Sequence, residues 1–246
     1  MADHIVSIPW GQEKISTTTR REHSLGTLGM TPDGRKFRWA FSDGALGAGT
    51  LLQQKAPTTT HDMDLAIQAA RAVGDQTIAV TLEAGAATLD QYEDGWIHIN
   101  DGAGEGHIYR IRSNPAAAAS ATLTVTLRQG DDVREALTVA TSLAGLMENE
   151  WKDVATHATT TVGQSAGVAP GEIADNSYFW CQRGGLASVL VEGTLVLGET
   201  ASPSTTTAGA VTPTSYAGTV ESDIIGRVTR VVSVTTAYQL LPLCLE

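Results

Sequence analysis

The 246-residue chain contains only two cysteines, three phenylalanines and four lysines, and it has no long apolar run. Two cysteines without a C-x-x-C pair exclude a zinc ribbon and a thioredoxin-like redox site. No stretch approaches the roughly 18 consecutive apolar residues of a membrane-spanning helix, so we expect no membrane span. Sixteen basic residues against 27 acidic ones give a net charge of −11. This surplus of negative charge repels phosphate, so we expect no nucleic-acid partner.

The residues that are abundant predict β structure. The chain has 32 threonines and 25 glycines, with 42% hydrophobic and 17% charged residues overall. Thr is β-branched and fits the pleated surface of a sheet, while Gly supplies the positive φ that tight turns need. The apolar content is sufficient for a buried core in one large or two small domains. We therefore predict a mainly β fold.

Periodicity divides the chain into three parts. Residues 1–24 are mixed and polar, which predicts an extended N-terminal arm. Residues 25–130 predict an N-terminal β-rich domain that opens with a β-hairpin, and the cleanest alternation of apolar residues with threonine lies at 121–127. Residues 131–246 predict a C-terminal β-barrel or β-sandwich-like domain, because short strands recur there between Gly-rich turns.

One short helix is predicted within this β-rich pattern, near residues 62–73. Five apolar residues fall on one stripe at the 3.6-residue period, namely Met63, Ala66, Ile67, Ala70 and Val73. Thr60 or Asp62 can cap the start of this helix, and Gly74 stands where it would end.

The segment Gly163–Gly167 matches the G-x-S-x-G pattern of a hydrolase nucleophile elbow, with Ser165 as the candidate nucleophile. That site needs a helix directly after the serine and a histidine later in the chain. Pro170 and Gly171 follow closely, and all six histidines precede Ser165. We therefore expect a Gly-rich connection between strands and no catalytic residue, with a serine hydrolase as a less favoured alternative.

A second glycine-rich segment, residues 102–106, lies between two predicted strands. A nucleotide site needs a helix after the glycines, so we expect no nucleotide cofactor. Acidic residues and histidines surround this segment: Asp90, Glu93, Asp94, His98, Asp101, Glu105 and His107. Their spacing is not that of an EF-hand, and turns commonly collect Asp and Gly, so we expect solvated turns and no metal.

Cys181 and Cys244 lie far apart in the sequence, each within an apolar run. Free cysteine behaves as a small hydrophobic residue. We predict two buried free thiols, with a single disulfide as the alternative.

Small-residue strand and turn patterns recur from about residue 25 to residue 243. The N-terminal ones are Leu25–Gly29, Asp33–Trp39 and Gly49–Gln53, and the middle ones are Tyr92–Asn100, Gly104–Gly106 and Tyr109–Ile111. The C-terminal ones include Gly167–Pro170, Tyr178–Trp180, Gly185–Leu190, Ala208–Val211, Ile225–Val228 and Leu241–Leu243. Together these segments resemble tailed-bacteriophage head proteins of the capsid decoration (cement) type.

This resemblance implies a non-enzymatic virion structural protein without catalytic residues or cofactors. It implies a homotrimer that binds the major capsid protein on the capsid surface, after synthesis in the host cytoplasm. Another virion component (a major capsid, spike or fibre-associated protein) is the first alternative. A carbohydrate-binding module is a further alternative, suggested by Trp39, Tyr92 and Trp96.

The N-terminal arm contains the residues that we predict to contact another subunit, Ile5, Ile8 and Trp10. An isolated Trp in a polar, Pro-containing segment has little to pack on within its own chain. The alternative is that the arm folds back onto its own barrel.

Overall fold

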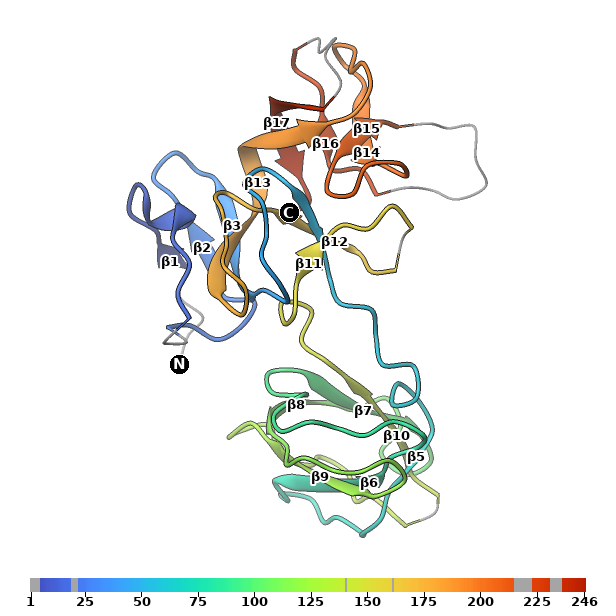
Figure 1. Ribbon diagram of the computed structural model, residues 1–246. Coiled ribbons are helices and arrows are strands. Elements are labelled where there is room, and N and C mark those ends of the chain that lie inside the picture. The colour runs from blue at the N-terminus through green and yellow to red at the C-terminus, as the bar shows by residue number, and fades with distance from the viewer. Residues whose placement is uncertain (1–4, 19–21, 140, 161, 215–222, 231–235) are drawn as a thin grey trace. The chain divides into compact units, whose positions relative to one another are not determined.

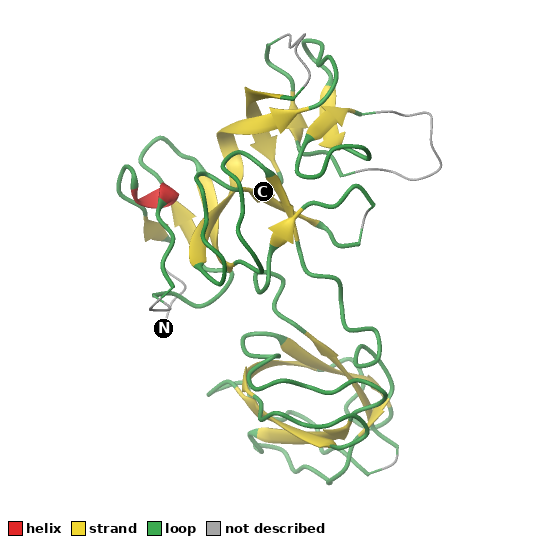
Figure 2. Cartoon of the chain, viewed as in Figure 1, coloured by secondary structure: helices red, strands yellow, loops and turns green. Residues whose placement is uncertain are grey.

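The chain divides into two compact units in the computed structural model (Figure 1). The structure describes residues 5–18, 22–139, 141–160, 162–214, 223–230 and 236–246. Unit 1 comprises Met1–Ala56 and Glu150–Glu246, and unit 2 comprises Pro57–Asn149. Unit 2 is therefore inserted into unit 1. The described residues are mainly β, as predicted, and their one helix is a single 3-10 turn (Figure 2).

Unit 2 is built from six described strands that close on themselves. The strands are β5 (Leu65–Ala66), β6 (Thr77–Thr81), β7 (Trp96–Asp101), β8 (Ile108–Ser113), β9 (Thr122–Leu127) and β10 (Leu143–Met147). They pair in the order β5-β10-β7-β8-β9-β6. An antiparallel bridge between Ile67 and Val80 then joins the end of β5 to β6 and completes a small barrel. Inward-facing side chains fill its interior, among them Ile97, Ile111, Leu123 and Val125.

The predicted helix near residues 62–73 is wrong, because this segment is extended. Leu65 and Ile67 are buried at alternate positions, which is the two-residue period of a strand. Met63 and Val73, which the helical stripe required on the buried side, are both exposed. The alanines of this segment fit either period, and the pairing of β5 with β10 selects the strand.

The domain boundary predicted between residues 130 and 131 lies inside unit 2 and is also corrected. β10 pairs with β5 and β7, so the chain beyond residue 130 is needed to complete the inserted barrel. Residues 131–155 show no clear helical or strand periodicity of apolar residues, so the last strand of unit 2 could not be predicted from the sequence.

Unit 1 contains two β regions that share one long strand. Its N-terminal part holds β1 (Val6–Ser7), the 3-10 turn η1 (Gln12–Lys14), β2 (Leu28–Met30), β3 (Lys36–Phe41) and β4 (Leu51–Gln53). Its second part holds β11 (Ala155–Thr156), β12 (Ser165–Val168), β13 (Tyr178–Val191), β14 (Thr200–Pro203), β15 (Val211–Pro213), β16 (Gly226–Arg227) and β17 (Ala237–Cys244). The first half of β13 pairs with β3, and its second half pairs with β17.

The second half of β13 belongs to another closed arrangement of strands. The described pairings run β13-β15-β14-β16-β17 and return to β13. A separate apolar core fills this ring, with Val189, Val191, Val211, Ile225 and Leu241 among its buried members. The C-terminal part of the chain is thus barrel-like, as predicted.

The N-terminal residues that the structure describes lie against unit 1. β1 runs parallel to β2, with Val6 opposite Gly29. Further along, Thr17 forms an antiparallel bridge to Tyr178. Within the described part of the chain, no helix is long and apolar enough to cross a bilayer.

Candidate functional site

The outer side of the β13–β17 ladder exposes a row of apolar side chains. Leu186 pairs with Pro242, Ser188 with Leu240, and Leu190 with Tyr238. Leu186, Leu240 and Tyr238 are 48%, 46% and 55% exposed. The intervening residues point into the barrel and are buried, namely Ala187, Val189, Val191, Leu241 and Leu243. We call the outward set Leu186, Ser188, Leu190, Tyr238, Leu240 and Pro242 the β13/β17 face.

The β13/β17 face carries no charge. Neither Gly184–Val191 nor Ala237–Cys244 contains Asp, Glu, Lys or Arg, although the chain as a whole has a net charge of −11. Isolated exposed apolar residues are normal on a protein surface, but a contiguous apolar patch marks a contact with another molecule. This arrangement therefore suits a binding surface.

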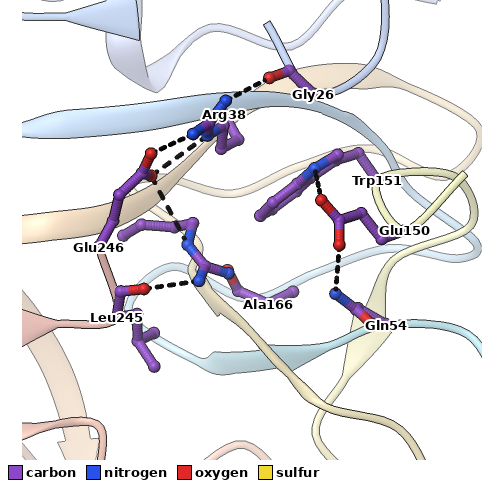
Figure 3. Close-up of polar contacts among 9 residues, drawn as sticks. Gly26, Arg38, Gln54, Glu150, Trp151, Ala166, Leu245 and Glu246 are labelled. Atoms are coloured by element: carbon purple, nitrogen blue, oxygen red, sulfur yellow. Dashed lines mark hydrogen bonds and ion pairs between the residues drawn. The ribbon is translucent and has the colours of Figure 1, made fainter. Parts of the chain in front are cut away.

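The register of this ladder is held by a cluster of polar contacts next to its end (Figure 3). The carboxylate of Glu246 accepts hydrogen bonds from Arg38 on β3, with Nε of Arg38 at 3.2 Å from Oε2. Nε of Arg183 lies 3.7 Å from the same oxygen. Arg183 also donates to the carbonyl oxygens of Leu245 at 2.6 Å and Ala166 at 3.0 Å. The residues that follow β17 are thereby tied to β3, β12 and β13.

Trp151 continues this cluster on its other side. The guanidinium carbon of Arg183 lies 5.1 Å from the centre of the Trp151 ring, which is within the range of a cation–π contact. The indole Nε1 of Trp151 donates to Glu150 at 2.8 Å, and Gln54 donates to the other carboxylate oxygen at 3.4 Å. Figure 3 shows Glu150 between these two donors. The cluster therefore holds Arg183 between Glu246 on one side and the Trp151 ring on the other.

The three arm residues predicted to contact another subunit have different environments. Ile8 is 1% exposed and packs in the core of unit 1, where it approaches Gly29 and Trp180. Ile8 is therefore not available to another subunit, and this part of the prediction is wrong because the arm folds against its own unit. Ile5 and Trp10 are 56% and 62% exposed. The guanidinium of Arg35 lies 5.9 Å from the Trp10 ring centre.

The G-x-S-x-G segment does not form a nucleophile elbow. Ser165 begins β12 and pairs with Gln53 on β4, so the chain continues as a strand where the elbow requires a helix. Its Oγ is buried and has no hydrogen-bond partner within the described part of the chain. The backbone N–H of Ser165 donates to Asp223 at 3.0 Å. Among the described residues, no base is therefore hydrogen-bonded to the hydroxyl of Ser165.

The acidic residues and histidines around residues 90–107 occupy turns and strand ends. Asp90 and Asp94 adopt positive φ values of 52° and 57°, which Asp tolerates in tight turns. His98 contacts the carbonyl oxygen of Asp62, and His107 contacts that of Gly104. Among the described residues, no group of three or more His, Cys, Asp or Glu side chains is arranged to hold a metal ion.

Two of the three aromatic rings considered for carbohydrate binding are buried. Trp39 lies in the core of unit 1, and Tyr92 lies in the core of unit 2. The hydroxyl of Tyr92 is 2.5 Å from Nδ1 of His61. Burial, with a smaller contribution from the charge of Glu148, raises the pKa of Tyr92 well above its usual value. Only Trp96 is partly exposed.

The two cysteines are free, and they differ in exposure. Cys181 is buried, and this burial raises its thiol pKa to about 12. Cys244 is exposed at the end of β17, so the prediction of a buried thiol is confirmed for Cys181 and wrong for Cys244. The apolar run around Cys244 alternates between buried residues, Leu241 and Leu243, and outward-facing ones, and sequence alone does not show on which side Cys244 lies.

Comparison with protein-family models, curated proteins and solved structures found no match. The β13/β17 face was not among the sites predicted from sequence. The sequence pattern that could have indicated this face is that both the odd and the even positions of residues 186–191 and 238–243 are largely apolar. A strand with only one buried face needs apolar residues at every second position.

Proposed function

We propose that this protein is a structural component of a tailed-bacteriophage head that decorates and stabilises the capsid shell. In this proposal it lies on the capsid surface, binds the major capsid protein and associates with further copies of itself, as a homotrimer. The observation that carries the proposal is the exposed, uncharged β13/β17 face on an otherwise acidic chain.

Charge favours a second copy of the chain as the partner of the β13/β17 face. Two molecules that each carry −11 repel one another where their acidic surfaces meet. The 16 residues of the two paired stretches contain no acid, so this face allows close approach without that repulsion. Homo-oligomers with closed symmetry are the commonest assemblies of soluble proteins.

The rest of the surface suits a shell with basic patches. Opposite charge on the two partners steers association and sets orientation. Contacts repeated over a symmetric lattice give a durable assembly even when each interface is modest, because the linked sites act together. The exposed side chains of Ile5 and Trp10 remain candidates for such contacts.

Light scattering coupled to size-exclusion chromatography tests the self-association. The wild-type chain is expected to elute as a trimer, and Leu240→Glu is expected to elute as a monomer because it places charge within the β13/β17 face. Leu197→Glu is the matched control, since Leu197 is 63% exposed and lies outside the face. A wild-type monomer at all concentrations, or dissociation by both variants alike, would overturn the assignment of this face.

Co-sedimentation with empty phage heads tests the shell-binding function separately. Wild-type protein is expected to pellet with the heads and to raise the temperature at which they rupture. Protein that remains in the supernatant with every head tested would contradict the decoration role, whatever its oligomeric state.

A further inference from the structure

A row of side chains crosses strands β10, β7 and β8 of unit 2 and ends at the residue that follows β9. Met147 on β10 pairs with Trp96 on β7, and Trp96 pairs with Arg110 on β8. The backbone N–H of Arg128, which follows β9, donates to the carbonyl oxygen of Arg110 at 2.8 Å. Neighbouring strands lie about 4.8 Å apart, so these four residues span about 14 Å. Arg112 lies two positions beyond Arg110 on β8, at an irregularity in the pairing of β8 with β9, and its side chain is exposed.

The arginines of this row are held in defined positions. The guanidinium carbon of Arg110 lies 5.0 Å from the centre of the Trp96 ring, in a cation–π contact. The backbone N–H of Arg110 donates to Asp131 at 2.5 Å, which fixes the strand beneath it. Arg112 and Arg128 are exposed. One guanidinium nitrogen of Arg128 lies 3.8 Å from the carboxylate of Asp94.

This row concentrates the few positive charges of an acidic domain. Unit 2 contains 13 of the 27 acidic residues but only five of the 16 basic ones, and all five are arginine. Three of those five lie in the row, beside the flat ring of Trp96 and the apolar end of Met147. The row therefore combines guanidinium groups with the apolar side chains of Trp96 and Met147. The remaining residues of unit 2 carry a net negative charge.

We infer that this row, Met147, Trp96, Arg110 and Arg128 with Arg112 beside it, binds an acidic polysaccharide in which charged sugars alternate with neutral ones. Guanidinium groups bind carboxylates through paired hydrogen bonds, and an aromatic side chain offers apolar area to the face of a sugar ring. The inference is independent of the capsid role and concerns a separate unit.

The spacing of charge on the ligand separates this occupant from a nucleic acid. Nucleic acids carry a phosphate on every nucleotide, and duplex DNA has one charge about every 1.7 Å. Such a chain would place phosphates over the acidic surface that surrounds the row. A polysaccharide with one carboxylate on every second sugar can place its charges at the arginines and its neutral sugars elsewhere.

Isothermal titration of the full-length chain with hyaluronan oligosaccharides tests the inference. Hyaluronan has one carboxylate on every second sugar, and chitin oligosaccharides of equal length serve as the uncharged probe. Arg112→Gln/Arg128→Gln changes two exposed side chains and is expected to weaken hyaluronan binding at least about tenfold, the size of effect that loss of charge-assisted hydrogen bonds produces. Arg227→Gln, an exposed arginine of unit 1, is the control and is expected to bind as wild type does.

The inference is supported if hyaluronan binds, chitin does not, and only the double variant is weakened. It is overturned if hyaluronan does not bind, if chitin binds equally well, or if Arg227→Gln weakens binding as much as the double variant. Tighter binding of a single-stranded oligonucleotide than of hyaluronan would also overturn it, and would assign the row to nucleic acid. Circular dichroism of each variant shows that the fold is retained.

Discussion

Arg38 and Glu246 lie 208 positions apart in the sequence and form an ion pair that joins β3 to the residues after β17. Both side chains are partly shielded from solvent, and Arg183 approaches the same carboxylate. We expect Glu246→Gln to lower the free energy of unfolding by about 1 kcal/mol, as measured by urea denaturation. Glu172→Gln removes the same charge from an exposed site and is the control. Equal stability of the two variants would show that this ion pair contributes nothing to folding.

The arm provides a second test, because two isoleucines three positions apart have opposite environments. Ile8→Ala would leave a cavity in the core of unit 1, and a loss of about 2–5 kcal/mol is expected. Ile5→Ala changes an exposed side chain and is expected to alter stability by less than about 0.5 kcal/mol. Thermal denaturation of both variants checks this difference. Similar melting temperatures would mean that the arm does not pack on its own unit in solution.

The buried hydroxyl of Tyr92 predicts a loss of stability in alkali. Its pKa is raised in the folded state, so the unfolded chain releases this proton first as the pH rises above about 10. The contribution of Tyr92 to stability is therefore complete below pH 10 and falls above it. Tyr92→Phe removes this titration, although it also costs about 1 kcal/mol near neutral pH through the lost contact with His61.

The stability gap between wild type and Tyr92→Phe is thus expected to narrow between pH 8 and pH 11, when each is unfolded by urea at fixed pH. A gap for Tyr92→Phe that stays constant over this range would contradict the buried position of its hydroxyl.

The cysteines are expected to react with a thiol reagent at very different rates. Cys244 is exposed and should be labelled by iodoacetamide in the native protein, whereas the pKa of Cys181 is raised to about 12 by burial. Mass spectrometry after short labelling should find one modified thiol in wild type and none in Cys244→Ser. Rapid labelling of Cys181 in the folded chain would be inconsistent with the core around β13.

The strands could be predicted from sequence wherever one face of the sheet is exposed to solvent. Residues 121–127 alternate apolar residues with threonine, and β9 forms there with Leu123 and Val125 inside. The helix predicted for residues 62–73 is wrong because alanine fits both the helical and the extended period. The long-range pairing of β5 with β10 determines that this segment is extended. The insertion of unit 2 left no local signal, since it depends on β10 returning to β7.

The candidate surfaces were less predictable than the strands. Ile8 and Ile5 are the same residue type in the same short segment, and only the parallel pairing of β1 with β2 separates a buried side chain from an exposed one. The row on unit 2 brings together residues from 96 to 147, and no single stretch of sequence shows it.

The strands that precede and follow unit 2 are hydrogen-bonded to one another, with Gln53 on β4 opposite Ala155 on β11. The inserted barrel therefore leaves and rejoins its host at one place. A short turn could connect β4 to β11 in place of unit 2, and unit 1 would keep its own cores and strand pairings. Such a junction lets the insert be removed or exchanged for a different module without redesigning the scaffold that carries it.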